Sequence, residues 1–227
     1  MEYRKLGNTD INVSVICLGT MTWGEQNSPA EAFEQIECAL EQGVNFIDTA
    51  ELYSIPPQAK TYGRTEEIIG EWLQKSGRRN EIVLASKIAG PGENWIPHIR
   101  GGKTRYNREY IRQAVDASLK RLQTDYLDLY QLHWPERQTN FFGQLGYQHR
   151  LDEEFTPLRE TLEALEEQRQ AGKIRHMTAN EIEETLVEAA CQQVDKKDTS
   201  RLVEFLKDDY GIKTFVQWMK AKFDINL

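Results

Sequence analysis

The sequence predicts an α/β fold with a parallel sheet, and three observations lead to this prediction. Short apolar runs alternate along the chain with amphipathic helical segments. The runs are apolar on both faces, which is typical of parallel strands that are covered by helices. Polar side chains stand at the carboxyl ends of several runs, at one common edge of such a sheet.

Five apolar runs are the expected strands. Each is short, and most end in one or more polar residues, as buried strands do where they leave the sheet. The runs are Val13–Met21, Val44–Ala50, Glu81–Ala89, Asp125–Trp134 and the weaker Gly172–Asn180.

Helical segments are expected between these strands. Ser28 begins a capping box, with Pro29 at the first helical position and Glu31 three residues after Ser28. Gly43 is a helix-ending residue at the other end of that segment. The remaining helices are expected over residues 66–74, after an Asn107 cap, and from Thr156 and Pro157 onward.

Two arrangements of such a sheet compete, an open doubly wound sheet and a closed TIM barrel. A doubly wound nucleotide-binding fold places GxGxxG after its first strand, where this chain has GTMTWG over residues 19–24. A barrel places polar residues at several strand ends, as this chain does with Asp48, Lys87, His133 and Asn180. The strand ends therefore favour a TIM (β/α)8-type barrel.

Four side chains at these strand ends have complementary chemistry. Tyr53 is a phenol, and a nearby Lys87 ammonium is expected to lower its pKa, while Asp48 keeps Lys87 charged. Tyr53 would then donate a proton to a carbonyl oxygen that His133 orients. The electrons would come from a separate hydride donor, most simply a nicotinamide. Each residue alone also has a structural interpretation as a cap or a packing residue, but four at successive strand ends favour a site.

On these residues the chain resembles the aldo-keto reductase superfamily and, within it, the Tas-like branch. The matching stretches are LGTMTWGEQNS, NFIDTAELY, SLKRLQTDYLDLYQLHWPERQTN and AGKIRH, and the similarity covers about residues 1–180. The resemblance implies a (β/α)8 barrel preceded by a β-hairpin, here Tyr3–Leu6 and Asn12–Val15. It also implies NADPH-dependent reduction of aldehydes and ketones, a small carbonyl compound being the substrate.

The resemblance also implies roles for individual residues. Tyr53 would be the proton donor, Lys87 and Asp48 would tune it, and His133 would orient the carbonyl. The residues that would face the cofactor are Gly19, Thr20, Met21, Asp48 and Asn180. Trp23 and Trp134 are candidates for an apolar substrate wall, and core packing explains each of them equally well.

The chain departs from the family pattern in its second half. We find about five β/α units where the barrel has eight, so we expect a truncated barrel over residues 1–180 and a helical tail over 181–227. Ala179 stands where the family usually has a serine. Two functions stay open: an active NADPH-dependent reductase, or an inactive homologue that is an interaction module or a fragment. A barrel hydrolase is disfavoured, because no metal-ligand cluster or catalytic carboxylate pair is recognisable.

Composition limits the partners and the compartment. The net charge of −8 disfavours nucleic acid and anionic membranes as partners. Three cysteines without a CxxC motif are typical of reduced thiols. There is neither a membrane-spanning apolar run nor an N-terminal signal region, so we expect a cytoplasmic protein. Open barrel edges predict self-association.

Overall fold

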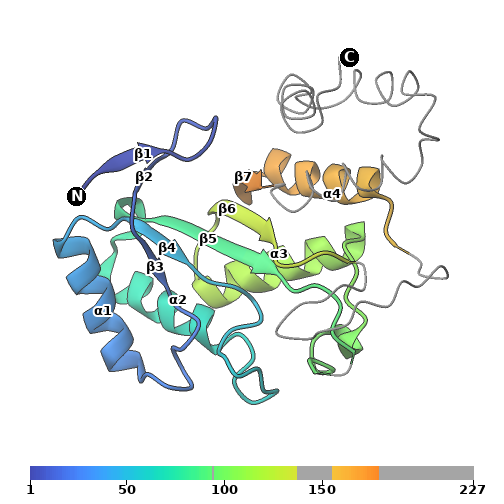
Figure 1. Ribbon diagram of the computed structural model, residues 1–227, viewed down its shortest axis with the longest axis horizontal. Coiled ribbons are helices and arrows are strands. Elements are labelled where there is room, and N and C mark those ends of the chain that lie inside the picture. Colours follow the sequence, from blue (N-terminus) through green and yellow to red (C-terminus); the bar gives the residue numbers. More distant parts are fainter. Residues whose placement is uncertain (94, 137–154, 179–227) are drawn as a thin grey trace, which may run out of the picture. The chain divides into compact units, whose positions relative to one another are not determined.

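Five parallel strands form the sheet of the computed structural model, which describes residues 1–93, 95–136 and 155–178 (Figure 1). The strands are β3 (Cys17–Gly19), β4 (Phe46–Asp48), β5 (Val83–Ile88), β6 (Leu127–Leu132) and β7 (Ile174–Thr178). Their spatial order is β3-β4-β5-β6-β7, the same as their order in the chain. A doubly wound sheet reverses its strand order at a switch point, and no reversal occurs among these five strands. The sheet therefore confirms the barrel type of α/β fold.

A β-hairpin precedes the sheet, as predicted. Its strands β1 (Tyr3–Lys5) and β2 (Asn12–Ser14) pair antiparallel. The expected strand Val13–Met21 was too long at its start, because Val13 belongs to β2 and pairs with Arg4. The Ser14 hydroxyl donates to the carbonyl of Ile16 and so turns the chain before β3 begins.

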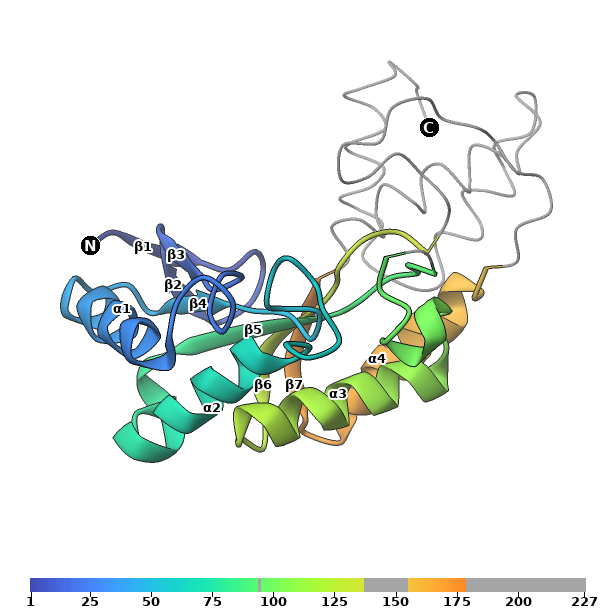
Figure 2. The same ribbon diagram turned by 90° about the horizontal axis from the view of Figure 1, so that it is seen from below.

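In the described part of the chain, four α-helices connect the strands, and in Figure 2 they follow one another along the same side of the sheet. They are α1 (Pro29–Glu41), α2 (Arg64–Ser76), α3 (Arg108–Leu122) and α4 (Leu158–Gln170). The described residues also form the short 3-10 helices η1 (Arg79–Glu81) and η2 (Arg100–Gly102). Helices on one side of a sheet with sequential strand order are the expected product of repeated right-handed crossovers.

Local capping explains where two of the helices begin. Ser28 accepts from the Glu31 backbone N–H, and the Glu31 carboxylate accepts from the Ser28 backbone N–H, so the predicted capping box is present. Asn107 accepts from the backbone N–H of Tyr110 and caps α3, also as predicted.

The main core lies between the helices and the sheet. It gathers the buried faces of the strands and the apolar stripes of all four helices. Its largest fully buried side chains include Trp23, Ile36, Ile68, Leu84, Ile111 and Tyr130. A second, smaller cluster of buried residues contains Leu52, Ala89, Ile96, Ile99 and Trp134.

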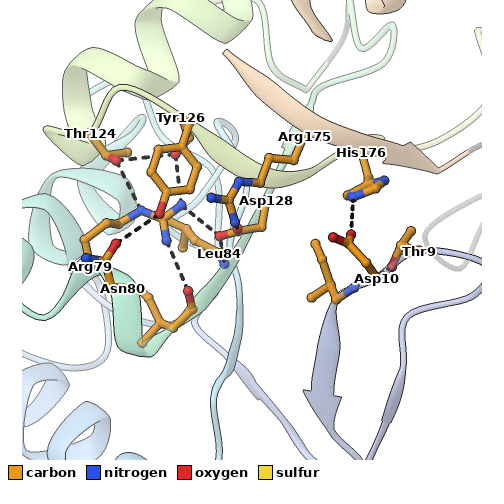
Figure 3. A network of polar contacts seen from close by, with 12 residues as sticks. Thr9, Asp10, Arg79, Asn80, Leu84, Thr124, Tyr126, Asp128, Arg175 and His176 are labelled. Atoms are coloured by element: carbon orange, nitrogen blue, oxygen red, sulfur yellow. Dashed lines mark hydrogen bonds and ion pairs between the residues drawn. The ribbon is translucent and has the colours of Figure 1, made fainter. Parts of the chain in front are cut away.

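A polar network joins the amino-terminal ends of β5, β6 and β7 (Figure 3). Asp128 is 2% exposed and accepts from Arg79, from Arg175 and from the Leu84 backbone N–H. Beside it, His176 on β7 lies 3.4 Å from an Asp10 carboxylate oxygen in the hairpin. These contacts fix the end of the sheet that lies opposite the predicted site.

The predicted tail over 181–227 lies outside the described residues, so the division of the chain at residue 180 stays a prediction. Among the described residues, no helix combines the length and the apolar character that crossing a membrane requires.

Candidate active site

Parallel strands carry three of the predicted site residues to one edge of the sheet. Asp48 is the last residue of β4, Lys87 lies near the end of β5, and His133 follows β6 directly. Tyr53 lies in the loop after β4, where its backbone N–H donates to the Ala50 carbonyl. The carboxyl ends of parallel barrel strands face the same side, so these residues share one mouth.

The structure brings these four side chains together. Lys87 Nζ lies 2.6 Å from Asp48 Oδ2 and 2.7 Å from the Thr49 carbonyl oxygen. The same Nζ lies 5.1 Å from the centroid of the Tyr53 ring. The Tyr53 and His133 rings meet edge to face, with their centroids 5.6 Å apart and an interplanar angle of 78°.

Lys87 is a largely buried ammonium, with 12% of its side chain exposed. Burial lowers its pKa, because a low-dielectric surrounding disfavours the charged form. The attraction and the hydrogen bond of Asp48 act in the opposite direction and raise it. Asp48 is therefore the main group that keeps Lys87 protonated.

Tyr53 departs from the prediction in its electrostatics. The sequence argument expected Lys87 to lower the Tyr53 pKa, but burial and, secondarily, the Asp48 charge raise it to about 12. The expectation was wrong because the Tyr53 ring packs against the smaller apolar cluster, which removes water from the phenol. Tyr53 therefore holds its proton firmly at neutral pH.

His133 is neutral over the physiological range. Burial, followed by the Lys87 charge, lowers its pKa to about 3. Its Nδ1 is buried, and within the described part of the chain no hydrogen-bond partner reaches that atom. An imidazole with a free buried nitrogen beside a phenol can bind a polar ligand atom there.

Two residues that the sequence analysis did not single out support this site. The Gln131 amide donates to Asp48 Oδ1 over 3.0 Å. Glu51 is fully buried, and its carboxylate accepts from the Ala89 backbone N–H and from Arg100. Gln131 had a signal in the sequence, since it is a polar residue in an apolar strand two positions before His133. Glu51 had none, because Arg100 is 49 residues away.

Comparison with known proteins identifies the family of this chain. The model of the aldo/keto reductase family matches residues 15–213. This chain belongs to the aldo/keto reductase family. The match runs past residue 180, beyond which the sequence analysis recognised no resemblance.

Individual relatives fall in the same family and confirm the Tas-like branch. Protein tas of Escherichia coli is 45% identical over 203 residues, which are 89% of this chain and 58% of that protein. The aldo-keto reductase YhdN of Bacillus subtilis is 36% identical over 182 residues, 77% of this chain and 45% of that protein. The chain thus spans about half the length of the curated relatives it matches.

Solved structures give the same result for the fold. The holo form of aldo-keto reductase AKR11C1 from Bacillus halodurans superposes with a TM-score of 0.59 at 35% identity. The superposition covers 82% of this chain and 54% of the other. The chain is therefore a member of the aldo/keto reductase family, and its fold is of the barrel type.

The residues that the resemblance places near a cofactor lie in different settings. Gly19 ends β3 beside Asp48, and a Cβ at Gly19 would meet no heavy atom within 4 Å. Thr20 is buried, and its hydroxyl donates to the backbone oxygen of Asp48. Met21 is 49% exposed. Asn180 lies outside the described residues, so its role in cofactor binding stays a prediction.

The two tryptophans proposed for a substrate wall also differ. Trp23 is fully buried in the main core and donates to Gln35 of α1, which favours the packing interpretation over the substrate wall. Trp134 lies in the smaller cluster against which Tyr53 packs, with its ring centroid 4.9 Å from that of His133. Of the two predicted wall residues, Trp134 is the one beside the candidate site.

A broad hollow of 920 Å³ lies at the other end of the sheet and contains none of the predicted site residues. It is lined by the hairpin and by the amino-terminal ends of the strands, including Asp10, Asn80, Tyr126, Asp128 and His176 (Figure 3). The convergent chemistry at Asp48, Tyr53, Lys87 and His133 decides the candidate site, because a hollow alone provides no reactive group. Within the described ranges, no group of three or more His, Cys, Asp or Glu is placed to bind a metal.

Proposed function

We propose that this chain is an NADPH-dependent reductase of aldehydes or ketones, in which Tyr53 donates the proton. The observation that supports this proposal is the Lys87–Asp48 ion pair of 2.6 Å next to the Tyr53 ring and His133. A phenol, an ammonium, a carboxylate and an imidazole in this arrangement suit protonation of a carbonyl oxygen.

The residues near Asp48 fit the nicotinamide end of the cofactor. Gly19 leaves open space beside the Asp48 strand end, so a flat ring can approach the backbone there. Gly19, Met21 and Asp48 would hold that end of the cofactor. When bound, the nicotinamide supplies the hydride that these side chains cannot provide.

Tyr53 stays protonated until negative charge develops on the carbonyl oxygen. A phenol with a pKa of about 12 is protonated at neutral pH, yet it is a stronger acid than an alcohol. As negative charge develops on the carbonyl oxygen, the proton on Tyr53 Oη moves to that oxygen. The phenolate that forms is stabilised by the nearby positive charge of Lys87, and this attraction favours the proton transfer.

His133 orients the carbonyl without adding charge. Because its pKa is about 3, the ring is neutral and one of its nitrogens carries a proton that can be donated. A hydrogen bond from this ring would hold the carbonyl oxygen beside the Tyr53 hydroxyl. A charged imidazolium would instead compete with Lys87 in the same buried site.

The test is NADPH binding by fluorescence titration, followed by loss of NADPH absorbance with a generic aldehyde. We expect Tyr53→Phe to lower kcat by about 10²–10⁴-fold while NADPH still binds. Tyr126→Phe is the matched control, since it removes a hydroxyl at the opposite end of the sheet. NADPH binding with equal turnover by wild type and Tyr53→Phe would contradict the role of Tyr53.

A non-catalytic function is the alternative that the sequence analysis left open, and the same titration tests it. In that case the wild-type chain would neither bind NADPH nor consume it. This outcome would reject the reductase and leave an interaction role for the same fold.

A further inference from the structure

We propose that Gln131 is a positioning residue that fixes the Asp48 carboxylate against Lys87. This inference rests on the proposed function, because it assigns a second support to the same proton-donor site. It starts from the two oxygens of Asp48, which have different donors. Lys87 Nζ occupies Oδ2 at 2.6 Å, and Gln131 Nε2 occupies Oδ1 at 3.0 Å.

The strand register explains how Gln131 reaches Asp48. Lys87 on β5 is the direct partner of Gln131 on β6, and Asp48 on β4 pairs with Ala85, two residues before Lys87. Paired residues of parallel strands point to the same face, and so do residues two apart. The Gln131 side chain therefore starts beside Lys87 and ends on Asp48, across the strand between them.

The chemistry of the contact requires an amide donor. A carboxylate only accepts hydrogen bonds, so the amide nitrogen and not the amide oxygen must face Asp48. This donor is neutral, whereas a second cation at the same place would oppose the positive charge of Lys87. Gln131 thus donates a hydrogen bond to the second oxygen of Asp48 without making the protonated form of Lys87 less stable.

The consequence is a fixed orientation. A carboxylate that is held through one oxygen can turn about its Cβ–Cγ bond, and the second donor prevents this rotation. The Lys87 ammonium then stays beside the Tyr53 ring, where the proposed mechanism uses its charge. Two other groups that influence Lys87, Cys17 on β3 and Glu66 on α2, do not contact Gln131 through any described hydrogen bond or ion pair.

Two substitutions with opposite expected effects on the protonation of Lys87 distinguish a positioning role of Gln131 from a packing role. Gln131→Met keeps the approximate length and removes the donor, so Asp48 is held less firmly and Lys87 should lose its proton at lower pH. Gln131→Glu keeps the length and adds a negative charge beside Lys87, so Lys87 should lose its proton at higher pH. Leu129→Met is the matched control, because Leu129 lies two residues earlier on the same face of β6.

The primary readout is the pH titration of Lys87, which is monitored by NMR on protein labelled with ¹³C-lysine. The Lys87 signal is assigned as the one that is missing from Lys87→Met. We expect the pH midpoint of the Lys87 titration to decrease by about one unit in Gln131→Met and to increase in Gln131→Glu. In Leu129→Met the midpoint should not change. Titration at the same pH in wild type and both Gln131 variants would overturn the proposal.

The second readout is turnover with NADPH and an aldehyde. We expect Gln131→Met to lower kcat about tenfold, with KM for NADPH within about twofold of wild type. An unchanged kcat in a folded Gln131→Met protein would also contradict the positioning role. If the wild type shows no turnover at all, the proposed function fails, whereas the Lys87 titration still decides the role of Gln131.

Discussion

Lys87 and Asp48 form an ion pair of 2.6 Å between two adjacent strands, and the candidate site is built around it. Only 12% of the Lys87 side chain is exposed, so its charge depends on a close anion. Asp48 provides that anion and is itself braced at its backbone oxygen by Thr20. The pair therefore places a positive and a negative charge near Tyr53, whose pKa is raised first by burial and then by Asp48.

Asp48→Asn should leave Lys87 with a lower pKa than in the wild type. The attraction and the hydrogen bond of Asp48 both raise the Lys87 pKa, while burial lowers it, so removal of the carboxylate leaves burial opposed only by the smaller effects of Cys17 and Glu66. NMR titration of ¹³C-labelled lysine measures this change. Asp10→Asn is the control, because the Asp10 side chain is 92% exposed and lies in the hairpin. A Lys87 that titrates as in the wild type would show that Asp48 does not support its charge.

The sequence predicted the positions of the site better than its energetics. Asp48, Lys87 and His133 were found because parallel strands bring their carboxyl ends together, which needs only the strand pattern. The raised pKa of Tyr53 was missed because it depends on the apolar cluster that packs on the ring. That cluster is formed by loops and strand ends that are far apart in the sequence, so no local sequence pattern predicts it.

The supporting contacts were missed for a similar reason. Gln131 meets Asp48 across 83 residues and Arg100 meets Glu51 across 49 residues, and neither pair has a spacing that the sequence can reveal. The hairpin, by contrast, followed from the family resemblance, and the helix caps at Ser28 and Asn107 followed from local residue preferences. Local rules predicted the elements, and tertiary contacts decided the chemistry.

His133 should make the protein less stable in mild acid. Its pKa is about 3 in the folded state, against an unperturbed value of about 6.5, so the unfolded chain binds more protons between these values. This contribution to stability is complete above about pH 6.5 and is lost as the pH falls toward 3. Between pH 7 and pH 5.5 the loss should be about 1 kcal/mol.

Urea unfolding of wild type and His133→Gln at both pH values measures this contribution. The other titrating groups are the same in the two proteins, so the difference in their pH dependence belongs to His133. We expect the variant to lose less stability on acidification than the wild type. Equal losses would show that the imidazole is accessible to protons in the folded protein.

Glu51 and Arg100 should be tightly coupled. Glu51 is fully buried, and it also links the Tyr53 loop to β5, because its backbone N–H donates to the Lys87 carbonyl. Arg100→Met leaves the buried carboxylate without its cation and should destabilise the fold by about 3–5 kcal/mol. Adding Glu51→Gln should recover part of this loss, since the unpaired charge is then removed. Additive effects in the double-mutant cycle would show that the two side chains do not interact.

Asp128 should contribute to stability and not to the candidate site. Its side chain is 3% exposed, and its carboxylate binds Arg79, Arg175 and the Leu84 backbone N–H at the amino-terminal end of the sheet (Figure 3). Asp128→Asn removes the charge that both guanidiniums share and turns an amide donor toward other donors. We expect a loss of about 3 kcal/mol in the free energy of unfolding.

Arg175→Gln provides the contrast at the same network. The Arg175 side chain is 56% exposed, so its ion pair with Asp128 is screened by water and should be worth less than about 1 kcal/mol. Urea unfolding orders the two variants, and the Lys87 titration should be the same in both because the network lies at the far ends of the strands. A larger loss for Arg175→Gln than for Asp128→Asn would mean that burial of Asp128 does not control this network.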